Sequence, residues 1–179
     1  LFNTYYGELK MSDGDYAKAL IYLENANILD PELGLAYLVR SKIYMALGWA
    51  PSAKEVFDSS LRLNLPTAPD YVDRAEIYAV FGDYSLAFLD FDEAIRINPN
   101  QAAYYNARAK AYANFNDLQS ALADFTTAIR IDPANGQYFI NRGVVYDILG
   151  ETSSSLADFE IARSLGTVDI PVSDERNPF

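Results

Sequence analysis

The sequence predicts an all-α solenoid built from five helix-turn-helix repeats, which gives ten helices. The first observation behind this prediction is a constant repeat period that runs through the chain without a gap. Positions that are one period apart form a column, and one column reads Leu23, Phe57, Phe91, Phe125 and Phe159. The second observation is a turn column of glycine or asparagine between two helical stretches in every period. A fixed period of about 34 residues is typical of solenoids, in which each repeat packs mainly on its neighbours.

Each repeat is predicted to contain two helices joined by a tight turn. Small residues recur in two columns, where paired helices must approach closely. The first column reads Gly7, Ser41, Ala75, Ala109 and Gly143, and the second reads Ala19, Ala53, Ala87, Ala121 and Ser155. The turn column reads Gly14, Gly48, Gly82, Asn116, Gly150, and these residues readily adopt the left-handed conformation that ends a helix. Directly after it, Asp15, Asp83, Asp117 and Glu151 can accept hydrogen bonds from the free amides of the second helix. Pro31, Pro99 and Pro133 then stop that helix.

Together with the aromatic column Tyr44, Tyr78, Tyr112 and Tyr146, this pattern resembles the tetratricopeptide repeat family. The resemblance covers residues 1 to about 167 and implies a right-handed α-α superhelix in one domain. The repeats are expected at 1–33, 34–67, 68–101, 102–135 and 136–167, and a tail without the repeat pattern at 168–179.

The composition argues against an enzyme. The chain has no cysteine and no histidine, so it lacks thiol nucleophiles, imidazole bases and the usual zinc ligands. Asp90 and Asp92 are two positions apart on a predicted helix and therefore point to different faces, so they are interpreted as solvated or structural acids. We expect no catalytic residues, no cofactor and no metal site.

Two charged columns predict a structural ion pair. Arginine recurs at Arg40, Arg74, Arg108 and Arg142, and aspartate recurs at Asp90, Asp124 and Asp158. The last three repeats carry both, whereas the first carries Tyr6 and Tyr22 at these positions. The planar guanidinium suits a carboxylate because it can donate two parallel hydrogen bonds. A phosphate-reading role is disfavoured because the arginines adjoin the core columns.

The resemblance further implies that the first helix of every repeat lines a concave face that binds a partner. Carried over position by position, the expected partner-binding residues are Tyr5, Glu8, Leu38, Lys42, Val72, Asp73, Glu76, Asn106, Lys110, Ile140, Asn141 and Asp147. The family's chaperone-binding carboxylate clamp is not expected. In the three available registers, Lys42 is the only cation at the clamp positions.

The net charge of −11 disfavours nucleic acid as a partner. No apolar run approaches the roughly 18 to 20 residues that span a bilayer, so membrane insertion is not expected. We expect a protein or peptide partner with apolar anchors and some positive charge. The alternative interpretation is that the acidity mainly keeps the surface soluble.

The two ends of the chain carry separate expectations. The sequence begins at Leu1, without an initiator methionine and inside a predicted helix, so a processed or excised fragment is expected. The apolar edge of the last helix near Leu156, Phe159 and Leu165 needs cover from the tail, from further sequence or from another molecule. The compartment is not determined; the cytoplasm is narrowly favoured over export.

Three hypotheses for the function follow. The favoured one is a non-catalytic scaffold that binds a peptide or protein segment. The second is a structural module that forms homo-oligomers through its exposed repeat ends, including the C-terminal edge. The third is the targeting region of a larger multidomain enzyme.

Overall fold

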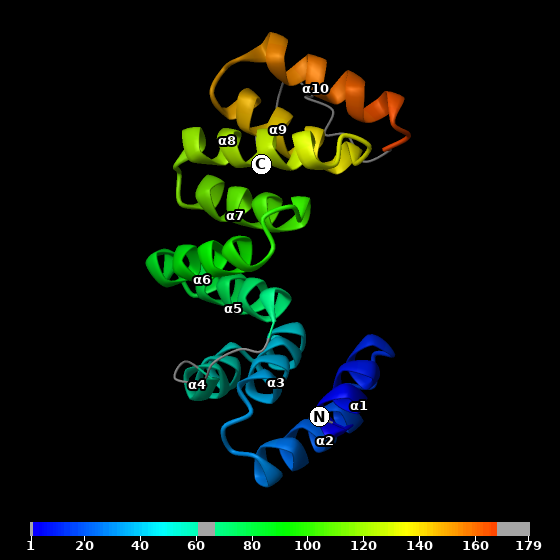
Figure 1. The fold of residues 1–179 in the computed structure, drawn as a ribbon, viewed down its shortest axis with the longest axis vertical. Helices are drawn as coiled ribbons and strands as arrows, with labels where there is room; N and C mark the ends of the chain where they lie inside the picture. The colour runs from blue at the N-terminus through cyan, green and yellow to red at the C-terminus, as the bar shows by residue number, and fades with distance from the viewer. Residues whose placement is uncertain (1, 61–66, 168–179) are drawn as a thin grey trace. The chain divides into compact units, whose positions relative to one another are not determined.

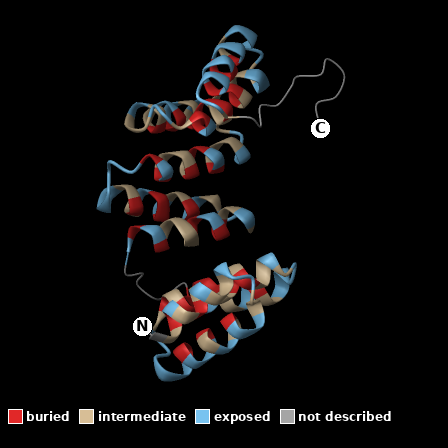
Figure 2. Cartoon of the chain, turned by 90° about the vertical axis from the view of Figure 1, so that its right-hand side faces the viewer, coloured by how far each residue is buried: buried red, intermediate tan, exposed pale blue. Residues whose placement is uncertain are grey.

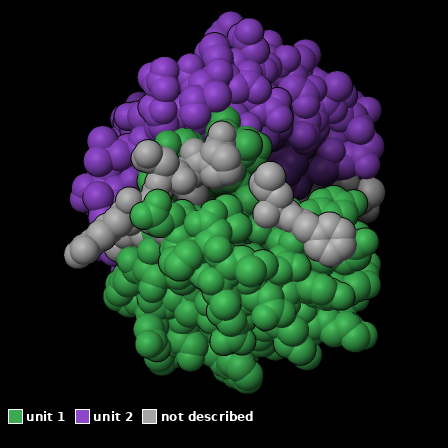
Figure 3. Space-filling view, turned by 60° about the horizontal axis from the view of Figure 1, so that its bottom comes forward, with its two compact units in different colours: residues 1–77 green, residues 78–179 purple. Residues whose placement is uncertain are grey.

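The computed structural model describes residues 2–60 and 67–167, which contain ten α-helices and no strand (Figure 1). This confirms the predicted fold class. The chain divides into two compact units, residues 1–77 and 78–179 (Figure 3). The boundary between them falls inside α5 (Ala68–Val80). The predicted tail, residues 168–179, lies outside the described residues.

Unit 1 contains two complete helical hairpins and most of α5. Its helices are α1 (Phe2–Ser12), α2 (Tyr16–Leu29), α3 (Gly34–Ala46) and α4 (Ala50–Ser60). Within this unit α1 packs on α2, α3 packs on α4, and α3 also contacts α1 and α2.

Unit 2 continues from the end of α5. Its helices are α6 (Tyr84–Ile97), α7 (Ala102–Asn114), α8 (Leu118–Ile131), α9 (Gly136–Ile148) and α10 (Thr152–Ser164). Here α7 pairs with α8 and α9 pairs with α10, while α9 also contacts α7 and α8. The first helices α3, α5, α7 and α9 begin at Gly34, Ala68, Ala102 and Gly136, so their starts are one repeat period apart.

The turn column adopts the predicted left-handed conformation. Its φ angles are 76° at Gly14, 76° at Gly48, 84° at Gly82, 66° at Asn116 and 77° at Gly150. Asn116 is the only residue other than glycine with a positive φ in the part of the chain that the structure describes. Asparagine tolerates this region better than most residues with a Cβ, which explains why it can replace glycine here.

The predicted helix caps are only half correct. Asp15 and Asp117 accept hydrogen bonds from the backbone amides of Lys18 and Ser120, at 3.3 and 3.2 Å. Asp83 and Glu151 stand at the corresponding N-cap positions, but their side chains make no capping bond. Glutamate has one more methylene than aspartate and fits the cap geometry less well. The structure gives no comparable reason for Asp83.

The packing columns form the core of both units, as predicted (Figure 2). The residues Leu23, Phe57, Phe91 and Phe125 are all buried, as are the small residues Ser41, Ala75 and Ala109. In unit 2, Phe125 lies in one cluster with Ala109, Ala121 and Val145. Each large ring therefore fills the space that small residues leave between neighbouring helices.

None of the described helices is both long and apolar enough to cross a membrane.

Candidate functional site

Three of the expected partner-binding residues come together in unit 1, each from a different first helix. Glu8 lies on α1, Lys42 on α3 and Asp73 on α5. The Lys42 Nζ donates a hydrogen bond to Asp73 Oδ2 at 2.7 Å, and both side chains are about one-third exposed. Glu8 and Lys42 belong to one column, so the repeat period itself places them on the same face of adjacent first helices. These three residues are called the α1–α3–α5 cluster below.

The cluster has an excess of negative charge. Partial burial raises the pKa of Glu8, and the carboxylates of Asp70 and Asp73 raise it further, while Lys42 opposes them. Asp70 is itself buried and accepts a hydrogen bond from the Thr67 amide at 3.0 Å, which caps the start of α5. Lys42 thus bonds to Asp73 and attracts Glu8, while the Asp70 carboxylate adds a further negative charge near Glu8.

Two expected residues of unit 2 are also joined, by amide groups rather than charges. Asn141 on α9 donates from Nδ2 to Asn106 Oδ1 on α7 at 2.8 Å. Gln137, one turn before Asn141, donates from Nε2 to Asn141 Oδ1 at 3.0 Å. The result is a row of three side-chain amides across the two first helices.

The other expected residues differ in exposure. Tyr5, Glu76, Lys110 and Asp147 are exposed, and Val72 is half-buried. Leu38 and Ile140 are buried, so they support the surface from beneath and offer little area to a partner. Periodicity places a residue on a face of a helix but does not determine whether a neighbouring helix covers it.

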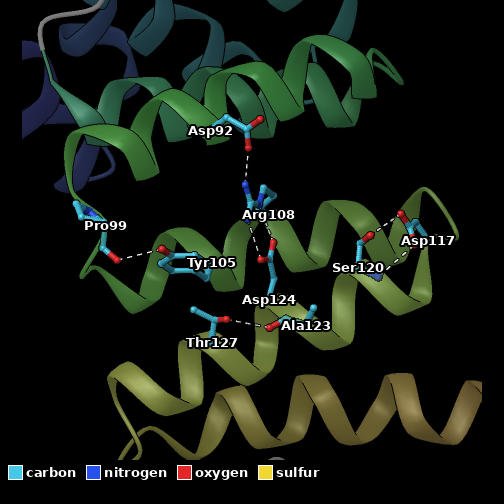
Figure 4. Close-up of polar contacts among 9 residues, drawn as sticks. All are labelled: Asp92, Pro99, Tyr105, Arg108, Asp117, Ser120, Ala123, Asp124 and Thr127. Atoms are coloured by element: carbon cyan, nitrogen blue, oxygen red, sulfur yellow. Dashed lines mark hydrogen bonds and ion pairs between the residues drawn. The ribbon is translucent and has the colours of Figure 1, made fainter.

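The predicted arginine–aspartate pairs are present in unit 2, and Figure 4 shows the one between Arg108 and Asp124. Arg108 on α7 donates from Nε and Nη2 to the two carboxylate oxygens of Asp124 on α8, at 2.7 and 2.8 Å. Arg142 on α9 grips Asp158 on α10 in the same way, at 2.8 Å for both bonds. The pairs join the two helices of one hairpin. The pairing of Arg74 with Asp90 stays a prediction.

Each of these arginines also reaches back to the preceding repeat, which the sequence interpretation missed. The third nitrogen of Arg108 donates to Asp92 on α6, and that of Arg142 donates to Thr126 on α8 at 3.1 Å. Asp92 and Thr126 occupy one column of the repeat. The sequence interpretation left open whether Asp92 is a solvated or a structural acid, and its bond with Arg108 makes it a structural one. The sequence signal for this contact was that the column of Asp92 and Thr126, on the second helix of the repeat before each arginine, is polar.

The arginines are further held by aromatic rings one turn away on either side. The Arg108 guanidinium carbon lies 5.9 Å from the ring centres of both Tyr105 and Tyr112. The equivalent distances for Arg142 are 5.8 Å to Phe139 and 5.7 Å to Tyr146. Burial alone would lower the pKa of Arg108, but its hydrogen bonds to Asp124 and Asp92 outweigh this effect and raise the pKa. Such a permanently charged, enclosed group stabilises structure rather than transferring protons.

Unit 1 replaces this arrangement with other contacts. In the first repeat, the rings of Tyr6 and Tyr22 lie 5.7 Å apart at the positions of the ion pair. In the second repeat, Val56 occupies the aspartate column. Arg40 therefore donates to Asn27 Oδ1 instead, at 3.2 Å, and its Nε is buried without a hydrogen-bond partner.

The C-terminal edge is partly as expected. Leu156 and Leu165 on and after α10 are exposed, but Phe159 is buried against Phe139, Ile140 and Ala162. Phe159 thus belongs to the core of its own hairpin and not to the open edge. Whether the tail covers this edge concerns residues outside those described.

In residues 2–60 and 67–167, no group of three or more acidic side chains is arranged to hold a metal ion.

The geometry defines a helical repeat protein, and comparisons identify the repeat. Residues 102–135 match the model of the tetratricopeptide repeat. No curated protein sequence is similar enough to the chain to count as a relative.

Solved structures share the fold over most of the chain. YrrB, described as "a TPR protein with an unusual peptide-binding site", matches with a TM-score of 0.71 and 21% identity, covering 91% of this chain and 84% of YrrB. PilW, a type IV pilus biogenesis factor, gives a TM-score of 0.81 at 20% identity, with 93% and 77% covered. MamA from Desulfovibrio magneticus RS-1 gives 0.76 at 18% identity, with 92% and 93% covered. Residues 102–135 thus match the tetratricopeptide repeat, and the chain has the fold of these proteins.

Proposed function

We propose that the chain is a non-catalytic interaction scaffold whose first-helix surface binds a peptide segment of another protein. The observation that carries the proposal is the meeting of Glu8, Lys42 and Asp73 from three successive first helices. Side chains that converge from separate helices on a partly exposed face can contact one extended segment together.

The charge of the α1–α3–α5 cluster favours a basic side chain in that segment. Glu8 and Asp73, with Asp70 nearby, carry three negative charges, and Lys42 offsets one of them. The raised pKa of Glu8 reflects both its burial and this crowding of carboxylates. A lysine or arginine from a partner would relieve the repulsion and donate hydrogen bonds to these oxygens. The half-buried Val72 lies on the same helix as Asp73 and offers an apolar contact beside it.

The amide row in unit 2 suits the main chain of a peptide. Side-chain amides both donate and accept hydrogen bonds, as peptide groups do. The exposed Lys110 lies one turn after Asn106 on the same helix. YrrB, which has a similar fold, is described as containing a peptide-binding site, and this supports the class of function.

The test is selection from a displayed peptide library on the immobilised chain, followed by affinity measurements with the selected peptides. Enrichment of lysine or arginine next to apolar residues is expected. Asp73→Lys should weaken binding by about tenfold or more, because it places a like charge opposite the basic side chain. Asp58→Lys is the matched control: Asp58 is an exposed acid on α4, where its side chain pairs with Lys54.

Selected peptides without basic residues would contradict the expected partner chemistry. Equal affinities for the wild type and the Asp73→Lys variant would rule out the α1–α3–α5 cluster as the binding surface.

A further inference from the structure

The second helix of the fourth repeat, α8, carries two threonines where the second helix of the third repeat, α6, carries two acids. Thr126 stands in a column that is otherwise acidic, and Thr127 stands one period after Glu93. The other members of the Thr126 column are Glu24, Asp58, Asp92 and Glu160. Two negative charges that α6 presents are therefore missing from the same positions of α8.

On α6, each of the two acids binds an arginine. Asp92 accepts a hydrogen bond from Arg108, whose other two nitrogens hold Asp124, so the guanidinium lies between two carboxylates (Figure 4). Glu93 accepts two hydrogen bonds from Arg96, at 2.8 and 2.6 Å. An arginine at the position of Arg108 thus accommodates a second oxyanion beside its paired aspartate.

The equivalent arginines next to α8 lack these carboxylates. Arg142 keeps its paired aspartate, but its Nη1 donates at 3.1 Å to Thr126 Oγ1, which belongs to a neutral hydroxyl. The Thr127 hydroxyl donates to the Ala123 carbonyl oxygen and offers no negative charge to Arg130. Arg130 is exposed, and it makes no hydrogen bond or ion pair with residues 2–60 and 67–167.

Three donor groups are directed to one place on the surface of unit 2. Arg130 follows Thr126 by one turn of α8, and a helical side chain leans toward the N-terminus of its helix, which directs the Arg130 guanidinium toward Thr126. Thr126 is exposed, and its hydroxyl proton has no acceptor within the described part of the chain. An oxyanion at this place can therefore accept hydrogen bonds from two guanidinium groups and one hydroxyl.

We propose that Arg130, Arg142 and Thr126 form a binding site for an oxyanion, which is either a phosphoryl group or a carboxylate. The oxyanion takes the place beside Arg142 that the Asp92 carboxylate takes beside Arg108. Hydrogen bonds between charged groups are the strong ones, so replacing the neutral Thr126 oxygen by an anion stabilises Arg142. The site uses none of the residues of the proposed peptide site, and its charge preference is the opposite of that of the α1–α3–α5 cluster.

Titration of the isotope-labelled chain with sodium phosphate or sodium acetate, at constant ionic strength, tests the proposal. The Nε–H signals of Arg130 and Arg142 in heteronuclear NMR spectra should shift and saturate. Arg96 is the control within the same spectra, because it shares the column of Arg130 but is paired with Glu93. The Kd at Arg130 should be at least about tenfold lower than at Arg96, as one further hydrogen bond to a charged group gives. The anion with the lower Kd identifies the ligand as a phosphoryl group or a carboxylate.

The double variant Thr126→Asp, Thr127→Glu installs the acids of α6 on α8. It should abolish saturable binding at Arg130, because its own carboxylates then occupy the site. It should also raise the melting temperature, since Arg142 gains a charged acceptor. Thr152→Asp with Ser153→Glu is the matched control, because it adds the same two charges at exposed positions at the start of α10. This control should bind the anion like the wild type.

Binding at Arg130 that is no tighter than at Arg96, for both anions, overturns the proposal. Binding that survives the double variant on α8 also overturns it, because an oxyanion cannot share its place with two carboxylates. If circular dichroism shows a lowered melt for that variant, Arg130→Met with Thr126→Val takes its place. This second variant removes two of the three donors, and an unchanged Kd measured at Arg142 contradicts the proposed site.

Discussion

The Arg108–Asp124 pair allows the most specific prediction about stability. Both side chains are largely enclosed, with 18% and 10% of their surfaces exposed, and Arg108 joins α6, α7 and α8 through its contacts with Asp92 and Asp124. Arg108→Met keeps an apolar stem between the flanking tyrosines but leaves the Asp124 carboxylate buried without its cation. We expect this variant to lose about 3 kcal/mol of unfolding free energy, the lower end of the range for broken buried pairs, because some water reaches the site.

A double-mutant cycle measures the interaction between Arg108 and Asp124 apart from the contacts that each side chain makes with other residues. Asp124→Leu alone should cost about 2 kcal/mol, because Arg108 keeps Asp92 as a partner and its hydrogen bonds to charged groups are only partly lost. Arg108→Met with Asp124→Leu should cost no more than about 2 kcal/mol, since no uncompensated charge stays buried and Asp92 turns to water. The coupling between the two positions is then about 3 kcal/mol.

Urea unfolding followed by circular dichroism measures these values, provided that the slope of the transition is unchanged among the variants. Arg130→Met is the matched control, because Arg130 is exposed on the same helix as Asp124 and should have little effect. A loss for Arg108→Met no larger than for Arg130→Met, or a coupling near zero, would refute the argument that the enclosed pair joins these helices.

Three further predictions concern the core, the charged cluster and the helix caps. Phe125→Ala should cost about 3 to 5 kcal/mol in the same assay, because it opens a cavity between α7, α8 and α9. Glu8→Gln should raise the melting temperature at neutral pH: the folded-state pKa of Glu8 is raised, so its ionisation destabilises the fold above that pKa, and the gain should vanish in acid. Asp117→Ala should lower the melting temperature at neutral pH, because hydrogen bonds from Ser120 lower the pKa of Asp117 and stabilise its charged form. That loss should shrink as the pH falls through the lowered pKa, and Asp83→Ala, at a cap without a side-chain bond, should lose less.

The repeat columns predicted the core residue by residue because every repeat solves the same packing problem. A position that must be small or aromatic in one repeat must be so in the next. Phe91 and Phe125 could therefore be assigned to the core from the repeat columns alone. The pairing of Arg108 with Asp124 and of Arg142 with Asp158 could be predicted for the same reason, since the last three repeats carry both an arginine and an aspartate at these positions.

The contacts that vary between repeats could not be predicted in this way. Asp92 and Thr126 occupy one column with different chemistry, and only the structure shows that both accept a hydrogen bond from the arginine of the next repeat. Asp83 and Asp117 are identical residues at equivalent caps, yet only Asp117 makes the side-chain capping bond to its helix. Side-chain rotamers decide such details, and a column does not encode them.

The sequence alone determined the helices, their ends, the small and aromatic core positions and the identity of the repeat, because these depend on periodicity and on local conformational preferences. The tertiary structure decided which members of a face stay accessible. Leu38 and Ile140 are covered although their register places them with Glu8 and Lys42, and Leu9 is uncovered although its column is otherwise core. Exposure depends on which neighbouring helices are present, and this is a property of the packed chain rather than of any single repeat.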